Sequence, residues 1–147
     1  EDKKMNKIAV VYWSSTGNTE TMANAIADSA KAAGADVTLS EVTAVTADET
    51  AAYDVIALGC PAMGAEVLEE GDFEPFFADL EGKLSGKKVA LFGSYDWGDG
   101  QWMRDWFDRT RNAGADLCQE EGLIANNEPD EEALDACRAL GEKLASA

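Results

Sequence analysis

The segment from Ser14 to Thr19 has the composition of an anion-binding loop. It reads Ser-Ser-Thr-Gly-Asn-Thr, so hydroxyl groups, a side-chain amide and a glycine stand directly before a predicted helix. The start of a helix presents unpaired backbone N–H groups and a partial positive charge, which favour a phosphate. The segment lacks the lysine of a P-loop and the three-glycine spacing of a dinucleotide-binding turn. A phosphate monoester therefore fits best, although the same composition is typical of an ordinary helix cap.

Two later loops offer side chains that suit a flat aromatic ligand. Residues 59–66 read Gly-Cys-Pro-Ala-Met-Gly-Ala-Glu, and residues 92–98 read Phe-Gly-Ser-Tyr-Asp-Trp-Gly. An indole stacks on a planar ring system, and a thioether is a soft contact for a ring face. Trp97 lies between an aspartate and a glycine, where a large aromatic side chain more often serves a ligand than a core. Met63, by contrast, could also plug the end of a sheet.

Hydrophobic periodicity predicts the elements that position these loops. Strands are predicted at 7–13, 36–42, 53–60, 88–93 and, interrupted by polar residues 120–122, at 116–119 and 123–125. Helices are predicted from 20 to 34, around 48–52, 73–80 and 102–113, and from an N-capping Asp130 to about 145. This alternation predicts a parallel sheet covered by helices on both faces. The loops starting at Ser14, Pro61 and Ser94 then follow the carboxyl ends of strands, where ligands bind.

Together the three loops resemble the FMN-binding loops of the short-chain, clostridial-type flavodoxins. The resembling segments are residues 12–19, 59–66 and 92–98, within a match from about residue 7 to the C-terminus. The Thr-Gly-Asn-Thr core occurs across flavodoxin-like proteins, whereas the three segments in this order and spacing are highly specific. The resemblance implies an α/β fold, a flavodoxin-like doubly wound five-stranded parallel sheet of strand order 2-1-3-4-5.

The resemblance also implies which residues bind the cofactor FMN. The phosphate would be bound within 14–19, Met63 and Trp97 would sandwich the isoalloxazine, and Glu66 would accept a hydrogen bond from flavin N3. Gly64 would turn its carbonyl toward N5 when the semiquinone forms, since glycine changes the sign of φ without steric cost. The expected FMN-binding residues are Ser14, Ser15, Thr16, Gly17, Asn18, Thr19, Pro61, Ala62, Met63, Gly64, Glu66, Ser94, Tyr95, Asp96, Trp97 and Gly98.

Several side chains in and near these loops depart from that pattern or have a structural interpretation. Pro61 stands where certain relatives carry a serine able to touch the phosphate, and Asp96 stands where glycine is common. Apart from Glu66, the acidic run at 66–74 is interpreted as a solvated face. Trp102 and Trp106, four residues apart on a predicted helix, are expected to pack in the core or on the surface rather than against flavin.

The function implied by the resemblance is that of a low-potential one-electron carrier rather than an enzyme. Acidic residues around the flavin disfavour the anionic hydroquinone, so the carrier would shuttle between semiquinone and hydroquinone. The alternative is a flavodoxin-like protein dedicated to one partner, such as a ribonucleotide reductase activator. A receiver domain would need an acidic pair where Ser14 and Ser15 stand.

Charge and composition indicate the class of partner. The 147 residues include 29 acids and 12 bases, for a net charge of −17, which repels nucleic acid and anionic membranes. Partners are therefore expected to be redox proteins with basic docking surfaces. No run approaches the ~20 apolar residues of a membrane span. The expected protein is a cytoplasmic monomer.

The remaining composition limits the chemistry and the domain count. The chain has no histidine, and its three cysteines, Cys60, Cys118 and Cys137, show no metal-ligand spacing, so buried free thiols and no metal site are expected. Any redox chemistry therefore needs a bound cofactor. Residues 1–4 are all charged and are interpreted as a tag remnant or a disordered tail, and 5–147 as a single domain.

Overall fold

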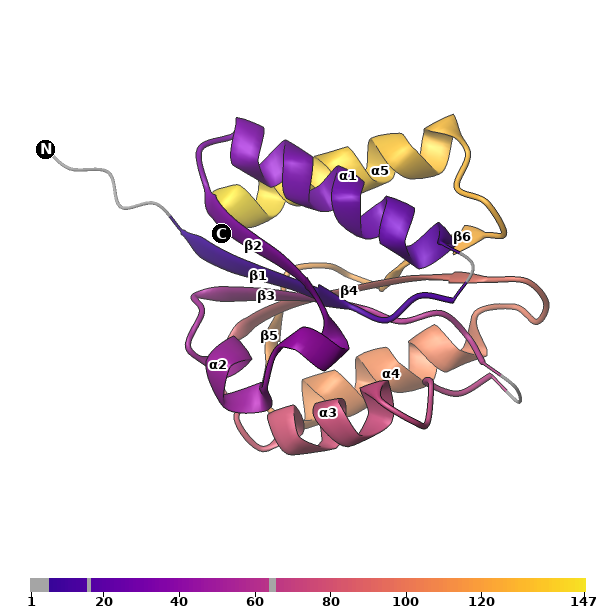
Figure 1. The fold of residues 1–147 in the computed structure, drawn as a ribbon, viewed down its shortest axis with the longest axis horizontal. Helices are drawn as coiled ribbons and strands as arrows, with labels where there is room; N and C mark the ends of the chain where they lie inside the picture. The colour runs from indigo at the N-terminus through magenta and orange to yellow at the C-terminus, as the bar shows by residue number, and fades with distance from the viewer. Residues whose placement is uncertain (1–5, 16, 64–65) are drawn as a thin grey trace, which may run out of the picture.

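A parallel β-sheet forms the centre of the molecule (Figure 1). The computed structural model describes residues 6–15, 17–63 and 66–147, so the expected tail at 1–4 lies outside the described residues. The strands are β1 (Lys7–Tyr12), β2 (Asp36–Glu41), β3 (Val55–Gly59), β4 (Lys88–Tyr95), β5 (Asp116–Leu117) and β6 (Leu123–Asn126). Their order is β2-β1-β3-β4-β5, with β6 also paired to β4, and every pairing is parallel. The predicted fold class and strand order are confirmed.

Helices cover both faces of the sheet, as alternating strands and helices predict. They are α1 (Asn18–Ala32), α2 (Ala47–Ala51), α3 (Phe73–Glu81), α4 (Gln101–Asn112) and α5 (Glu131–Ala145), with a 3-10 turn at Val42–Ala44. α1 and α5 lie on one face, and α2, α3 and α4 lie on the other (Figure 1). All the predicted helices are present, with ends within about two residues of those expected. The Asp130 side chain caps α5 by accepting from Ala133 N at 2.8 Å.

Two hydrophobic layers hold the helices to the sheet. β3 is buried along its whole length, with alternate side chains entering the two layers. The layer under α3 and α4 contains Trp102 and Trp106, each 2% exposed, so their predicted packing role is confirmed. Cys60 and Cys137 are buried and Cys118 is half-buried, and all three thiols are free. Burial raises the pKa of the Cys137 thiol to about 12, which disfavours its thiolate form.

The interruption predicted in the last strand is present, and a side chain bridges it. β5 pairs with the start of β4, and β6 pairs with its end. Between them, the Gln119 amide accepts from Leu91 N at 2.9 Å and donates to Leu91 O at 3.1 Å. An amide side chain has the same donor and acceptor as a peptide group. Gln119 therefore supplies the two hydrogen bonds that a continuous strand would have made.

The fourth strand is longer than expected. Ser94 and Tyr95 were predicted to open the aromatic loop, but both belong to β4 and pair with Ala125 and Asn126 of β6. That pairing is non-local, since the partners lie some thirty residues further along the chain. A local sequence pattern does not contain it, and the aromatic loop begins at Asp96.

The acidic run before α3 is not only a solvated face. The Glu69 carboxylate accepts from the backbone N–H groups of Gly71, Asp72 and Phe73 at 2.7–2.8 Å, where α3 begins. Burial opposes the charge on Glu69, but these three backbone bonds outweigh it and lower the pKa. Glu69 is thus the N-terminal cap of α3, a role that Asp72 does not take with its side chain.

Replacing Glu69 with alanine is expected to lower the free energy of unfolding by about 2 kcal/mol at pH 7, because three charge-assisted hydrogen bonds are lost. The folded-state pKa is depressed, so this stability is present above the unfolded pKa of about 4.3 and disappears as pH falls through the folded value. Urea unfolding at pH 7 measures the loss of stability, and urea unfolding below pH 4 measures its disappearance at low pH. Glu70→Ala is the control, since Glu70 is exposed; equal losses in the two variants would contradict the capping role.

Candidate functional site at the carboxyl ends of the strands

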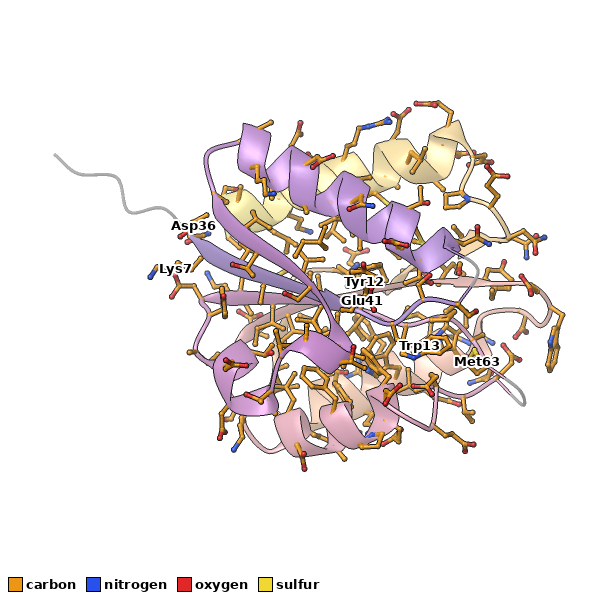
Figure 2. The ribbon with its side chains drawn as sticks, in the orientation of Figure 1. Lys7, Tyr12, Trp13, Asp36, Glu41 and Met63 are labelled. Atoms are coloured by element: carbon orange, nitrogen blue, oxygen red, sulfur yellow. The ribbon has the colours of Figure 1, made fainter. Side chains whose placement is uncertain are left out.

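The three candidate loops meet at one edge of the sheet. Tyr12, Trp13 and Met63 lie toward this edge, whereas Lys7 and Asp36, which begin β1 and β2, lie at the opposite one (Figure 2). Trp13 N donates to Gly59 O at 3.0 Å and Ala62 N donates to Ser94 O at 3.0 Å, so each loop is tied at its base to the neighbouring strand. The predicted convergence of the loops is confirmed for the described residues.

The first loop leads into α1 through a glycine. Gly17 is the N-cap of α1 with φ +97°, a backbone conformation that a residue with a side chain adopts only under strain, and it has no side chain with which to cap the helix itself. Ser14 Oγ accepts from Gly17 N at 3.2 Å and Glu20 N at 3.3 Å. Among the described residues, none accepts from the N–H groups of Asn18 or Thr19. Thr16 lies outside the described residues.

Thr19 turns inward and contacts the end of β4. Its Oγ1 lies 2.9 Å from Ser94 Oγ and accepts from Ser94 N at 3.3 Å. Thr19 is 1% and Ser94 5% exposed, so this contact between the first and third candidate segments is buried. Nearby, Tyr12 Oη donates to the Glu20 carboxylate at 3.2 Å, and burial followed by the charge of Glu20 raises the pKa of the tyrosine. Sequence reasoning did not anticipate either pair.

The second loop folds back on itself after Pro61 and Ala62. Met63 and Val67 exchange backbone hydrogen bonds at 2.9 and 3.0 Å and so form an isolated antiparallel β-bridge. Gly64, with Ala65, lies outside the described residues. Glu66 has φ +57°, and its carboxylate accepts from Gln101 N at 3.1 Å, at the start of α4. Glu66 therefore links the second loop to the third.

The third loop holds its tryptophan in solvent. Trp97 is 62% exposed, the most exposed large apolar side chain in the part of the chain that the structure describes. Behind it, Asn126 donates to Tyr95 O and Asp96 O, and Asn127 N donates to Tyr95 O at 2.7 Å. Sequence reasoning missed this support, although Asn-Asn at the end of a strand is a turn signal. The indole is thus presented from a loop whose base is fixed.

The comparison with protein families agrees with this geometry. A family model described as Flavodoxin matches residues 10–141, nearly the whole chain. The chain belongs to the flavodoxin family. Flavodoxins bind FMN and carry electrons between redox proteins rather than acting as enzymes, and this chain is such a carrier.

Individual flavodoxins are similar over almost their full length. The chain is 52% identical to a flavodoxin of Clostridium beijerinckii, covering 93% of this chain and 98% of that one. It is 51% identical to a flavodoxin of Megasphaera elsdenii, covering 95% and 99%. The solution structure of two-electron reduced Megasphaera elsdenii flavodoxin superposes with a TM-score of 0.87, covering 95% of this chain and 99% of that one. The resemblance to the short-chain type is therefore confirmed.

The residues at this edge of the sheet fit FMN. A phosphate monoester needs hydrogen-bond donors, which the helix start supplies through N–H and hydroxyl groups, and the described part of the loop adds no acidic side chain until Glu20. A planar ring needs an exposed apolar face, which Trp97 supplies. The Thr19–Ser94 contact joins the start of α1 to the end of β4, and Trp97 follows Ser94 by three residues.

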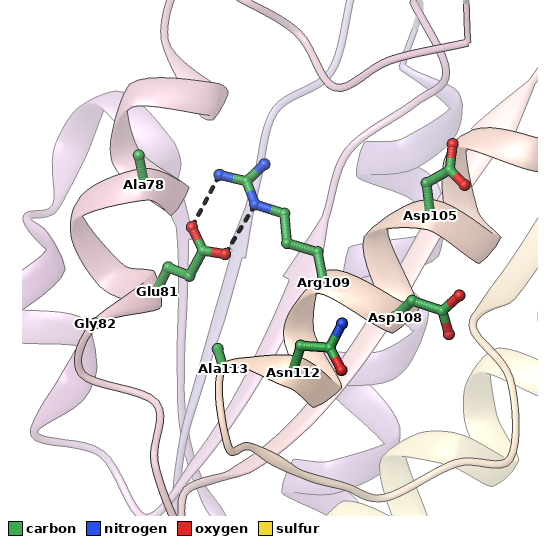
Figure 3. A pocket seen from close by; sticks show the side chains of 8 residues that line it. All are labelled: Ala78, Glu81, Gly82, Asp105, Asp108, Arg109, Asn112 and Ala113. Carbon is green, nitrogen blue, oxygen red and sulfur yellow. Dashed lines mark hydrogen bonds and ion pairs between the residues drawn. The ribbon is translucent and has the colours of Figure 1, made fainter.

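A separate groove of about 770 Å³ between α3 and α4 does not have these features (Figure 3). It is lined by Ala78, Glu81, Gly82, Asp105, Asp108, Arg109, Asn112 and Ala113. Arg109 crosses it, binds Glu74 and Glu81 through four hydrogen bonds, and lies 4.8 Å from the Phe77 ring centre. The two carboxylates raise the pKa of Arg109. These ion pairs join α3 to α4 on one face of the sheet and do not involve the loops at the carboxyl ends of the strands.

Proposed function

We propose that FMN lies across the carboxyl ends of β1, β3 and β4, with its phosphate at the start of α1 and its ring against Trp97. The observation that carries this placement is the exposed indole of Trp97, on a loop whose preceding strand is bonded to the phosphate loop at 2.9 Å. Bound FMN supplies the chemistry that the side chains lack, because it accepts and releases electrons one at a time. The residues of this chain hold it, exclude water from it and set its potential.

The phosphate is proposed to bind the first loop without a cation. The N–H groups of Asn18 and Thr19 are free donors among the described residues, and the positive end of the α1 dipole favours a dianion. Ser14 Oγ accepts from Gly17 N, so its own hydroxyl proton can be donated to the phosphate, and Ser15 is exposed next to it in the chain. Thr16 completes the proposed set from outside the described residues.

The isoalloxazine ring is proposed to lie between Met63 and Trp97. Pro61 and Ala62 form the base of the second loop, and Tyr95 and Asp96 lead into the third. Glu66 is proposed to accept from flavin N3 with the carboxylate oxygen that does not bind Gln101 N. A side chain on Gly98 would meet the Glu66 carboxyl at 2.6 Å, so the glycine leaves room for this carboxylate. Gly64, outside the described residues, is proposed as the partner of flavin N5.

The carrier is proposed to work at low potential. The net charge is −17, and the first and third loops contain no lysine or arginine between residues 14 and 19 or between 94 and 101. Adding a negative charge to bound flavin therefore meets repulsion without a compensating cation, which lowers the potential of the second one-electron reduction. The carrier would then deliver electrons to acceptors that are hard to reduce.

Replacing Glu66 with glutamine is expected to raise the potential of the second reduction of bound FMN by tens of millivolts. The substitution removes a negative charge near flavin N3 but keeps a hydrogen-bond acceptor, and ~59 mV is a tenfold effect for one electron. Anaerobic spectroelectrochemistry measures the potential. Glu70→Gln, an exposed acid four residues further on, is the control for general charge. An unchanged potential in Glu66→Gln would refute this role for Glu66.

Partners are proposed to be redox proteins with basic surfaces that dock weakly on a monomer in the cytoplasm. Weak, salt-sensitive contacts suit a carrier that must dissociate after each transfer. Within the described residues, no helix is both long and apolar enough to cross a bilayer. Transfer rates that fall as ionic strength rises would support basic docking, and salt-independent rates would contradict it. Sedimentation of the holoprotein tests the monomer.

The first experiment is a visible spectrum of the purified protein, followed by stepwise anaerobic reduction. Flavin absorption that passes through the long-wavelength band of half-reduced flavin would support the proposed site and its one-electron use. A protein that stays colourless when FMN is added would contradict the placement of the cofactor at these loops. Direct reduction to the two-electron state would contradict only the separation of the two steps.

A further inference from the structure

Within the described residues, the buried contact between Thr19 and Ser94 leaves one hydroxyl proton without an acceptor. The two hydroxyl groups, 75 positions apart in the chain, share a single hydrogen bond of 2.9 Å. Ser94 N also donates to Thr19 Oγ1, at 3.3 Å. Two hydroxyls have two protons, and only one of them can lie in the shared bond. No other described residue accepts from either group, although buried donors are nearly always paired.

The direction of the shared bond decides which proton is left over. A hydroxyl oxygen has two lone pairs, and Ser94 N already occupies one of those on Thr19. If Ser94 Oγ donates into the other, both lone pairs of Thr19 are filled and its own proton must go to a third group. If Thr19 donates instead, the free proton belongs to Ser94. A ligand near Thr19 that offers only acceptors favours the first arrangement.

We propose that Ser94 is a positioning residue for the FMN phosphate and acts through Thr19. By donating to Thr19 with both its N–H and its hydroxyl, Ser94 turns the Thr19 proton outward as a fixed donor to a phosphate oxygen. This inference rests on the proposed binding of the phosphate at the start of α1. It differs from a direct contact of Ser94 with the cofactor, since the Ser94 hydroxyl proton is directed at Thr19 Oγ1 in this arrangement.

The test compares FMN with riboflavin, which has the same ring and ribityl chain but no phosphate. Both ligands are titrated into the full flavin-free chain of the unchanged protein and of Ser94→Ala. The expected result is an FMN dissociation constant about tenfold higher in Ser94→Ala, as for the loss of one charge-assisted hydrogen bond, with the riboflavin constant unchanged. The ³¹P resonance of bound FMN is expected to shift in Ser94→Ala, which a merely structural role would not produce.

A double-mutant cycle separates action through Thr19 from direct action. In a Thr19→Val background, Ser94→Ala is expected to cause no further loss of FMN affinity, because the donor that it orients is already gone. Thr110→Val is the matched control. Thr110 is also fully buried and its hydroxyl donates to Trp106 O within α4, so its loss is expected to lower stability but to leave the FMN-to-riboflavin ratio unchanged.

The outcomes distinguish this inference from the proposed function. Equal losses for FMN and riboflavin in Ser94→Ala, or a tenfold FMN loss that persists in the Thr19→Val background, would overturn the role of Ser94 as a positioning residue. If Ser94→Ala leaves the ratio of the FMN and riboflavin dissociation constants unchanged, the role of Ser94 is overturned but the proposed function stands. Failure of the unchanged protein to bind FMN would overturn the proposed function and this inference with it.

Discussion

Replacing Trp97 with alanine is expected to raise the dissociation constant of FMN about 30-fold, which corresponds to about 2 kcal/mol. The indole is 62% exposed to solvent, so a flavin ring stacked on it would bury a large apolar face. Burial of an aromatic face and its stacking energy together account for that magnitude. Because the side chain makes little contact with the fold, the free energy of unfolding of the flavin-free chain should change by less than about 0.5 kcal/mol.

Fluorescence titration with FMN and urea unfolding of the flavin-free chain measure the two quantities separately. Val67→Ala is the matched control, since Val67 is the other large apolar side chain exposed in the described residues, at 42%. Its truncation removes exposed apolar surface at the same edge without removing a stacking partner. If Trp97→Ala and Val67→Ala weaken FMN binding equally, the indole does not stack on the ring.

The secondary structure was predictable because it depends on local patterns. The spacing of apolar residues over one or two helical turns placed all five helices, and the apolar run at 53–60 identified the central strand, which the structure has at Val55–Gly59. The break at 120–122 was also visible as an acidic interruption. What that pattern did not contain is the Gln119 side chain that spans the break, because its partner, Leu91, is 28 positions away.

The loop residues show a similar division. Their types predicted a phosphate and a flat ring, and the family resemblance assigned each position. The supporting contacts were not predictable, because Thr19 with Ser94 and Glu66 with Gln101 each join distant segments through a single hydrogen bond. For Glu69, the interpretation from sequence was incomplete. A run of acids at the surface is usually solvated, but here the Glu69 carboxylate caps a helix.

The close approach of two strands at Gly93 gives the largest expected loss of stability. Gly93 lies in β4, and a Cβ added there would stand 2.2 Å from the backbone oxygen of Cys60 and 3.1 Å from the Trp102 ring. That same oxygen accepts from Trp102 Nε1 at 3.1 Å. The missing side chain therefore allows the end of β3 to reach the indole of α4 across β4.

Gly93→Ala is expected to lower the free energy of unfolding by about 3 kcal/mol or more, because overpacking against a backbone cannot be relieved by a rotamer change and the buried indole N–H loses its acceptor. Urea unfolding measures this. Gly82→Ala is the matched control, since nothing lies within 4 Å of a Cβ at Gly82 and its φ is −72°, so that variant should stay within about 0.5 kcal/mol of the unchanged protein. A change as small as that of Gly82→Ala in the free energy of unfolding of Gly93→Ala would mean that β3 and β4 can separate at the base of the second loop.

Displacement of Cys60 by the added methyl group should also weaken FMN binding, because Pro61 of the second loop follows Cys60 directly. Gly82→Ala should leave FMN binding unchanged.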